Sequence, residues 1–217
     1  MKVKFEKAKP IMFSTDLVKA ILNGEKTQTR RLVKPQPEIR NGETGVFEKM
    51  DDGTFQMQID GYKGLIYDYP IKPKYFVGDI LYVPECQSID EHYTVYDAEE
   101  PIVKVTYKAD NSTLYHHVSQ KEWERLAKYD WSILGTTPKF ISPYWTTKET
   151  ARLFLEVVGV RVERLQDISE FDAAAEGADG VISFANLWDS TIKKDRLNTD
   201  GWDANPWVIV YAFKRIE

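Results

Sequence analysis

The chain has 217 residues, of which 42% are hydrophobic and 29% are charged, and its formal net charge is −5. These values are typical of a globular protein and exclude a disordered chain, a collagen-like chain and a pure coiled coil. The apolar runs are shorter than the roughly 18 residues that a membrane helix needs. The basic N-terminus lacks the apolar stretch of a signal peptide, and the single cysteine, Cys86, cannot form an internal disulfide. We therefore expect a cytoplasmic protein without a membrane partner.

Positive charge is concentrated at the beginning of the chain. Residues 1–40 hold 10 Lys and Arg but only 4 Asp and Glu, so the acidic excess lies in the remaining residues. A polyanionic partner such as RNA would be expected to contact these first forty residues. A basic face without any partner explains the same pattern equally well.

The first regular element is a helix over residues 14–24. Ser14 or Thr15 can accept hydrogen bonds from the first amides, and Gly24 permits the left-handed conformation that ends a helix. Its apolar residues recur at helical spacing and form one stripe: Leu17, Val18, Ile21 and Leu22.

A short basic segment follows the helix and is a candidate functional site. It presents, within six positions, Lys26, Thr27, Thr29, Arg30 and Arg31. In a regular strand, Lys26 and Arg30 would lie on one face and Thr29 and Arg31 on the other. Lys26 and Thr29 can therefore share a cleft only if the turn after Gly24 offsets Lys26. A solvated basic hairpin without function is the alternative interpretation.

The middle of the chain is rich in turns. We expect a hairpin over Phe47–Ile59, strands at residues 80–83 and 101–109, and a short helix near residues 119–128. Ser119 and Glu122 have the spacing of a capping box at the start of this helix.

The last third is the most regular part of the sequence. Residues 151–165 predict one long strand, or two that are separated at Gly159. Ser169 and Asp172 predict the capped start of a short helix that ends at Gly177.

A second short helix is expected over residues 181–190, with Ile182, Ala185 and Trp188 on one side. Residues 205–216 predict a closing strand that is covered on both faces. Several strands and few short helices predict a single α+β domain over residues 1–217, built as a partly closed β-barrel. Residues 40–75 and 88–145 are interpreted as insertions.

Common catalytic signatures are missing from the sequence. His116 and His117 are adjacent rather than spaced for one helix face, and neither a CxxC nor an HExxH motif occurs. Nucleotide-binding glycine fingerprints are also missing, so we expect no metal and no cofactor. Cys86 is interpreted as a buried structural thiol, because neither a base nor a cause of a lowered thiol pKa is evident.

Four segments, in the right order, resemble the ASCH-domain proteins of the PUA-like superfamily, in particular those of phages and prophages. The first segment is residues 10–37, in which Gly24, Lys26 and Arg31 match the glycine–x–lysine pattern with its later arginine. The others are FVGDILYVPE, the segment at 151–177, and the C-terminal segments NLWDS and WDANPWVIVYAFKRI.

This resemblance implies a PUA-like β-barrel with short flanking helices and with a cleft near the Gly-x-Lys segment. One bacterial member of the group is an acetylcytidine amidohydrolase that works with a lysine, a threonine three positions later and a distant glutamate. These positions correspond here to Lys26, Thr29 and Glu176. The resemblance also suggests residues that bind substrate or nucleic acid: Gly24, Arg30, Arg31, Asp79 and Glu85.

These side chains suit amide hydrolysis. Thr29 can supply a nucleophilic hydroxyl, a desolvated Lys26 can act as its base, and Glu176 can orient the lysine or pass a proton. Arg31 can hold a phosphate or pair with Glu176. The plainer interpretations are a phosphate contact for Lys26, a strand residue for Thr29 and a surface carboxylate for Glu176.

Three functions remain open. The first is binding of RNA or a modified nucleobase, with or without hydrolysis of an amide such as that of acetylcytidine. The second is a non-catalytic RNA-binding module of a phage or prophage, for which aromatic loops at 62–76 and 131–145 would suit base stacking. The third is a protein-interaction factor.

Two further features bear on these functions. Pro84, beside Glu85, departs from the pattern of the ASCH family at this position. Four tryptophans are interpreted as core or loop anchors: Trp145, Trp188, Trp202 and Trp207.

Overall fold

The chain divides into two compact units. The computed structural model describes residues 5–37, 44–60, 66–93, 101–129 and 139–216. Unit 1 consists of residues 1–23, 80–155 and 215–217, and unit 2 consists of residues 24–79 and 156–214. Each predicted insertion contributes a three-stranded sheet of its own. Parts of the two predicted aromatic loops, 62–65 and 131–138, lie outside the described residues.

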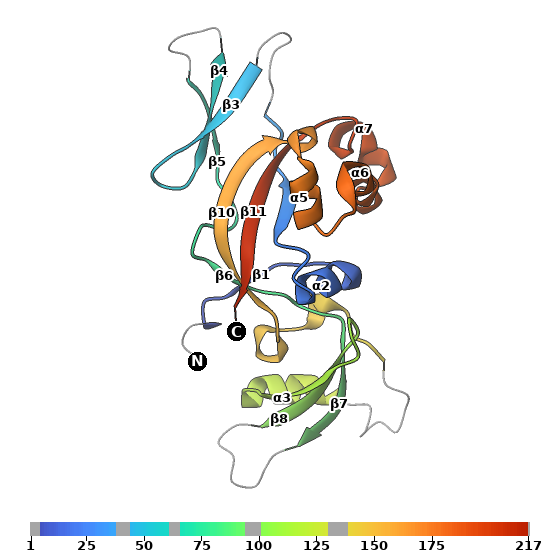
Figure 1. Ribbon diagram of the computed structural model, residues 1–217. Helices are drawn as coiled ribbons and strands as arrows, with labels where there is room; N and C mark the ends of the chain where they lie inside the picture. The colour runs from blue at the N-terminus through green and yellow to red at the C-terminus, as the bar shows by residue number, and fades with distance from the viewer. Residues whose placement is uncertain (1–4, 38–43, 61–65, 94–100, 130–138, 217) are drawn as a thin grey trace. The chain divides into compact units, whose positions relative to one another are not determined.

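The central element is a five-stranded sheet that curls into half a barrel. Together with the short helices it confirms the α+β class (Figure 1). Its strands, in spatial order, are β1 (Lys9–Pro10), β6 (Ile80–Tyr82), β10 (Phe154–Arg164), β11 (Trp207–Ile216) and β2 (Gln28–Leu32). The strand predicted at 151–165 is therefore one strand, β10, and does not break at Gly159.

In unit 1, β1 pairs in parallel with β6, and helix α2 (Thr15–Leu22) follows β1 in the chain. The Ser14 hydroxyl accepts from the Leu17 N–H at 3.4 Å, and Gly24 follows the helix with a φ of +79°. The predicted limits of this helix are therefore confirmed.

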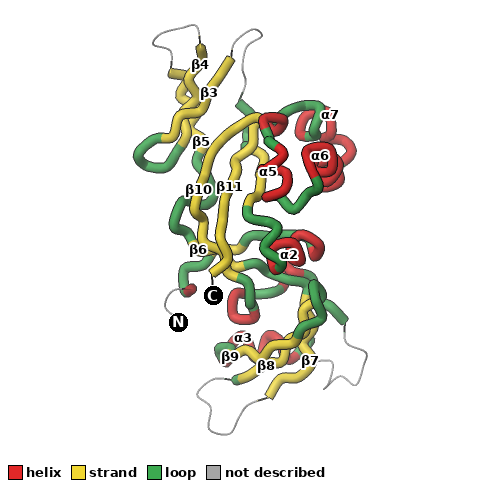
Figure 2. The backbone as a smooth tube through the Cα atoms, viewed as in Figure 1, coloured by secondary structure: helices red, strands yellow, loops and turns green. Residues whose placement is uncertain are grey.

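A three-stranded antiparallel sheet also belongs to unit 1. Its strands are drawn in yellow in Figure 2. Its strands are β7 (Gln87–Tyr93), β8 (Ile102–Tyr107) and β9 (Thr113–His117). The alternating residues of β8 are buried against helix α3 (Gln120–Ala127), where they form a core with Ile89, Val118 and Leu126. Two 3-10 turns follow, η1 (Pro143–Trp145) and η2 (Lys148–Thr150).

The cap of α3 differs from the prediction in one partner. The Ser119 hydroxyl accepts from the Glu122 N–H at 3.3 Å, as expected. The Glu122 carboxylate instead binds Arg125, and the Ser119 N–H donates to Glu149 at 2.5 Å. A residue distant in sequence thus completes the cap, because Glu122 has a stronger charged partner one turn away.

Unit 2 contains the predicted hairpin. Strands β3 (Thr44–Lys49) and β4 (Phe55–Asp60) pair in register with Phe47 opposite Met57, and β5 (Ile66–Ile71) adds a third strand that the sequence did not predict. On the five-stranded sheet, β2 pairs with β11, with Thr29 opposite Tyr211.

Two short helices cover one face of β11 (Figure 1). They are α5 (Glu170–Ala175) and α6 (Gly180–Thr191). Their buried residues Ala173, Phe184 and Trp188 pack on Val208 and Val210. The remaining turns are η3 (Leu165–Asp167), η4 (Lys194–Arg196) and α7 (Leu197–Asp200).

One predicted helix face is wrong. Trp188 is buried as expected, but Ile182 is 82% exposed. Phe184 shares the buried face of α6 with Trp188, because residues four apart lie above one another on a helix.

Candidate functional site

A cluster of buried and half-buried charges joins β2 to helix α5 in unit 2. Its members, called here the charge cluster, are Lys26, Arg30, Arg161, Glu163, Asp172 and Glu176. The three cations balance the three carboxylates. Charges are buried in proteins chiefly when they are paired in this way.

Lys26 and Glu176 form the innermost pair of the charge cluster. The Lys26 Nζ donates to the Glu176 carboxylate at 2.7 Å and to the backbone carbonyl of the same residue at 2.8 Å. Their side chains are 1% and 5% exposed. The structure therefore brings together two of the three side chains predicted to be catalytic.

Local signals in the sequence explain why Glu176 occupies this place. Ser169 and Asp172 form both hydrogen bonds of the predicted capping box, which begins α5. The helix ends at Glu176, and Gly177 follows with a φ of +82°. The carbonyl groups at a helix end lack partners within the helix, so that of Glu176 can accept from Lys26.

Arg30 forms ion pairs with carboxylates of the protein itself. Its guanidinium donates to Glu176 at 3.1 Å and to Glu163 at 2.7 Å, and its carbon lies 5.6 Å from the centre of the Phe184 ring. Arg30 as a whole is 3% exposed. In this arrangement the Arg30 guanidinium holds Glu176 and Glu163, a role that the sequence did not predict, and its contact with substrate or nucleic acid stays a prediction.

The outer part of the charge cluster connects β10 with α5. Arg161 donates to Glu163 at 2.6 Å and to Asp172 at 3.1 Å, and Gln28 donates to Asp172 at 2.9 Å. Sequence reasoning missed Arg161 and Glu163 as members. Their spacing of two along a predicted strand, which places both on one face, was the available signal.

Thr29 occupies a different position from the other two predicted catalytic residues. It is 4% exposed, and the alternation of β2 places it on the face opposite to Arg30. That the Thr29 hydroxyl acts together with Lys26 and Glu176 stays a prediction.

Burial dominates the electrostatics of Lys26. Desolvation lowers the pKa of its ammonium below the ordinary value of 10.5, although the Glu176 carboxylate opposes the shift. Arg30 and Arg31 lower this pKa further by repulsion. At a given pH, the neutral form of Lys26 is consequently more populated than the neutral form of a lysine in water.

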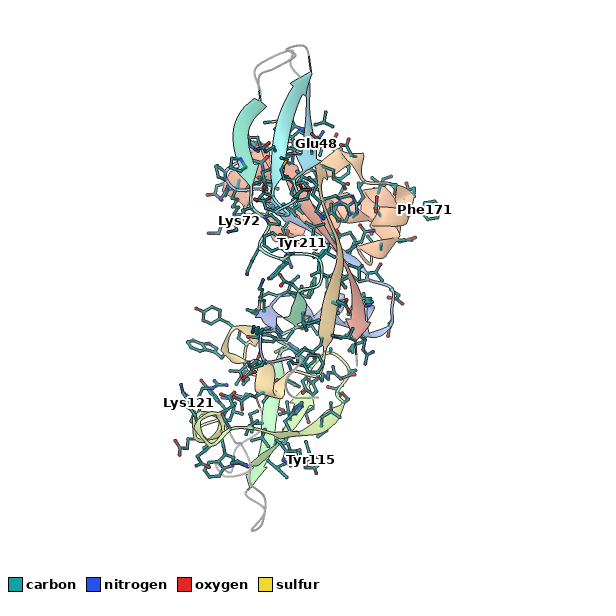
Figure 3. All side chains as sticks on the ribbon, turned by 90° about the vertical axis from the view of Figure 1, so that its left-hand side faces the viewer. Glu48, Lys72, Tyr115, Lys121, Phe171 and Tyr211 are labelled. Carbon is teal, nitrogen blue, oxygen red and sulfur yellow. The ribbon has the colours of Figure 1, made fainter. Side chains whose placement is uncertain are left out.

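Arg31 is exposed to solvent on the face of β2 that also carries Thr29. The surrounding protein nevertheless desolvates its guanidinium and lowers its pKa, while Glu176, Tyr75 and Tyr211 oppose this shift. Tyr75 and Tyr211 are buried with their rings edge to face at 5.2 Å, and the Tyr211 hydroxyl accepts from the Lys74 N–H at 3.0 Å (Figure 3). Arg31 is thus exposed as a residue, while its guanidinium lies in a partly desolvated setting beside Tyr75 and Tyr211.

Gly24 and Asp79, predicted to bind a ligand, shape the backbone here. Gly24 has a φ of +79°, and space for a Cβ atom is open around it. The Asp79 carboxylate accepts from the Phe76 N–H at 2.8 Å and closes the turn at Gly78, whose φ is +90°. These contacts explain both positions without a ligand.

Glu85, the remaining predicted binding residue, belongs to unit 1. Its two carboxylate oxygens accept from Arg152 at 2.9 and 2.8 Å. Arg152 also donates to Asp110 at 2.8 Å, and its guanidinium carbon lies 4.1 Å from the centre of the Tyr107 ring. Sequence reasoning missed Arg152 as the partner that neutralises Glu85.

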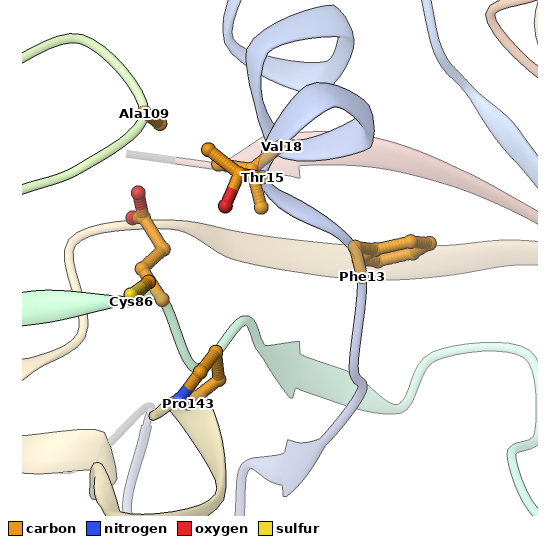
Figure 4. Close-up of a pocket in the computed structure, with 7 residues that line it drawn as sticks. Phe13, Thr15, Val18, Cys86, Ala109 and Pro143 are labelled. Atoms are coloured by element: carbon orange, nitrogen blue, oxygen red, sulfur yellow. The ribbon is translucent and has the colours of Figure 1, made fainter. Parts of the chain in front are cut away.

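A small hollow beside Glu85 measures about 200 Å³ when the open solvent at its mouth is counted (Figure 4). Burial raises the pKa of the half-buried Cys86 thiol, so the thiol stays protonated and is a poor nucleophile. The hollow is lined by Glu85 with Phe13, Thr15, Val18, Cys86, Ala109 and Pro143.

In the described part of the chain, no group of three or more His, Cys, Asp or Glu residues is arranged to hold a metal ion. The helices found in those same ranges are too short or too polar to span a bilayer. No protein-family model, curated protein or solved structure matches this chain.

Proposed function

We propose that this chain is a PUA-like protein of the ASCH type that binds RNA or a modified nucleoside at the β2 edge of unit 2. The observation that carries the proposal is the contact between Lys26 and Glu176, which lie 150 positions apart in the chain. The two segments that resemble the ASCH family supply one residue each to this contact. A solvated basic hairpin without function would not be expected to bury its lysine against that glutamate.

Arg31 is the residue of this site best suited to contact a ligand. Lys26 and Arg30 are themselves buried with the Glu176 carboxylate, and Arg31 is the neighbouring cation of β2 that is exposed to solvent. A guanidinium binds phosphate through two parallel hydrogen bonds and also stacks on bases. The same carboxylate, Glu176, that holds Lys26 and Arg30 contributes to the field around Arg31.

Binding of a short single-stranded RNA and of acetylcytidine, measured by calorimetry, tests this function. Arg31→Gln should weaken the binding of RNA about tenfold, because charge-assisted hydrogen bonds contribute about 1.5–3 kcal/mol. It should also lower the slope of log affinity against log salt by about one. Arg196→Gln is the matched control, since Arg196 is an arginine of unit 2 that pairs with Asp200 outside the charge cluster. Equal affinities of the two variants would contradict the proposal.

A second candidate function, hydrolysis of an amide on a modified nucleoside, is favoured by the lowered pKa of Lys26. Neutral Lys26 would accept the proton of an attacking hydroxyl or water, and Glu176 would stabilise the resulting ammonium. The Lys26 ammonium passes this proton to the nucleoside nitrogen as the C–N bond breaks. Attack by water releases acetate directly, whereas attack by a hydroxyl leaves an acetyl ester that a further water hydrolyses. Because the Lys26 side chain is only 1% exposed, this reaction needs an opening that binding at Arg31 does not need.

Deacetylation of acetylcytidine, followed by chromatography, tests the second function. We expect the rate to rise with pH toward the lowered pKa of Lys26 and to fall about 10²-fold or more in Lys26→Ala. Glu156→Gln, which changes an exposed pair of the same unit, should keep the wild-type rate. A wild-type protein without activity, or an equally active Lys26→Ala variant, would eliminate hydrolysis and leave the binding function standing.

A further inference from the structure

A short segment of unit 1, Lys139–Lys148, presents three aromatic side chains to solvent. Tyr144 is 76% exposed, Trp145 is 57% exposed and Phe140 is 41% exposed. The expectation that Trp145 is a core or loop anchor is therefore wrong. Three exposed aromatic residues within six positions are unusual, because such side chains contribute most when they are covered.

The backbone beneath these rings is well held. The Ser142 hydroxyl accepts from the Tyr144 N–H at 3.3 Å, and the Thr146 hydroxyl donates to the Pro143 carbonyl at 2.9 Å. Ile141 exchanges two backbone hydrogen bonds with Gln87, at 2.7 and 3.3 Å, which fastens the segment to strand β7.

The two most exposed rings contact each other. The centres of the Tyr144 and Trp145 rings lie 5.1 Å apart, and their planes are inclined by 88°. The rings are therefore ordered before any partner arrives, which lowers the entropic cost of binding.

Lysines lie near the aromatic residues. Lys139 and Lys148 flank them in the sequence, and the Lys148 Nζ donates to the backbone carbonyl of Glu6 at 2.5 Å. The Lys108 Nζ lies 6.0 Å from the centre of the Phe140 ring. The segment from Lys139 to Lys148 contains no acidic residue.

The nearest acidic residue along the chain is already engaged elsewhere. Glu149 accepts hydrogen bonds from the backbone and hydroxyl of Ser119, at the start of α3. Planar rings interleaved with lysines match a single nucleic-acid strand, which offers base faces and phosphates together. A duplex hides its base faces and fits this arrangement less well.

We propose that Phe140, Tyr144 and Trp145 form a stacking surface for single-stranded nucleic acid and that Lys108, Lys139 and Lys148 contact its phosphates. We call these six residues the aromatic–lysine surface. It lies within unit 1 and shares no residue with the site around Arg31 in unit 2. The inference thus goes beyond the proposed function and can be tested independently of it.

The probe is a labelled oligouridylate of about 10 nucleotides, within the site sizes of single-strand binding folds. Its binding is followed by fluorescence anisotropy at low salt, with an oligothymidylate and a duplex as comparisons. We expect both single strands to bind more tightly than the duplex. Tyr144→Ala and Trp145→Ala should each weaken the binding about fivefold or more. Trp145→Phe, which keeps a ring, should restore most of the lost affinity.

Phe171→Ala is the matched control. Phe171 is an aromatic residue of unit 2 that is 90% exposed and points away from the protein, but acidic residues, Glu170 and Asp172, flank it (Figure 3). Its replacement should leave the affinity unchanged. Lys139→Gln and Lys148→Gln should each reduce the salt slope by about one. Circular dichroism verifies that every variant is folded.

Two results would overturn the inference: no binding of either single strand by the wild-type protein, or Tyr144→Ala and Trp145→Ala variants that bind as tightly as Phe171→Ala. Arg31→Gln separates the two proposals. If it weakens binding while the aromatic variants do not, the site around Arg31 stands and the aromatic–lysine surface fails. The opposite pattern supports the aromatic–lysine surface and contradicts the proposed role of Arg31.

Discussion

Replacing Glu176 by glutamine removes the carboxylate that Lys26 and Arg30 share, while it keeps nearly the same side-chain volume. The two cations have side chains that are 1% and 0% exposed, so water cannot take over the role of the carboxylate. Removing one partner of a buried ion pair costs about 3–5 kcal/mol. Arg30 keeps Glu163 at 2.7 Å, so most of this loss falls on Lys26.

We therefore expect Glu176→Gln to lower the free energy of unfolding by about 3 kcal/mol at neutral pH. Urea unfolding followed by tryptophan fluorescence should show a midpoint that is lower by about 1 to 3 M. The loss should shrink as the pH rises, since Lys26, whose pKa is already lowered by burial, sheds its proton in the folded state before it does so in the unfolded chain.

Two further variants make this expectation specific. Lys26→Met combined with Glu176→Gln should recover much of the stability, because no uncompensated lysine remains. Glu156→Gln, which breaks the exposed pair with Lys214 at 3.1 Å, should cost less than about 1 kcal/mol. If Glu176→Gln destabilises the protein no more than Glu156→Gln does, the charge cluster is not the buried network described here.

Two other perturbations test unit 1 and helix α5. Burial and the nearby Arg152 lower the pKa of His116 to about 4, so stability should fall as the pH drops from about 6.5 to about 4, by at most about 3 kcal/mol. His116→Gln should flatten this part of an acid titration followed by circular dichroism, whereas His117→Gln, at the exposed neighbour, should leave it unchanged. Ser169→Ala removes the hydroxyl that caps α5 and should lower the free energy of unfolding, measured by heat or urea, by about 1 kcal/mol. Ser169→Asp should retain most of the stability, because its carboxylate can cap the helix as well. A Ser169→Ala variant as stable as the wild type would show that the cap contributes nothing.

Local signals predicted the helices well. Ser14 and Gly24 delimit α2, and both hydrogen bonds of the Ser169–Asp172 capping box form, because these features involve only neighbouring residues. The cap of α3 shows the limit of such reasoning. Its second acceptor, Glu149, arrives from a different part of the chain, and local spacing carries no information about it.

Strands and buried partners were harder to predict from the sequence. Strand β5 was missed because its single proline and its two tyrosines give no clear alternation of apolar and polar residues, and only its pairing with β4 defines it as a strand. Residue alternation correctly placed Thr29 and Arg30 on opposite faces of β2. The contact between Lys26 and Glu176 was suggested by the family resemblance rather than by spacing, and the carboxylates around Arg30 depend on tertiary packing.

The divided construction of unit 2 has a consequence for how the protein is made. Lys26 leaves the ribosome long before its partner Glu176, which lies 150 positions later. In the meantime β2 lacks its neighbour β11, and the whole middle of unit 1 must be synthesised first. Closing so long a loop is slow, and an unpaired strand edge in a nascent chain is prone to association.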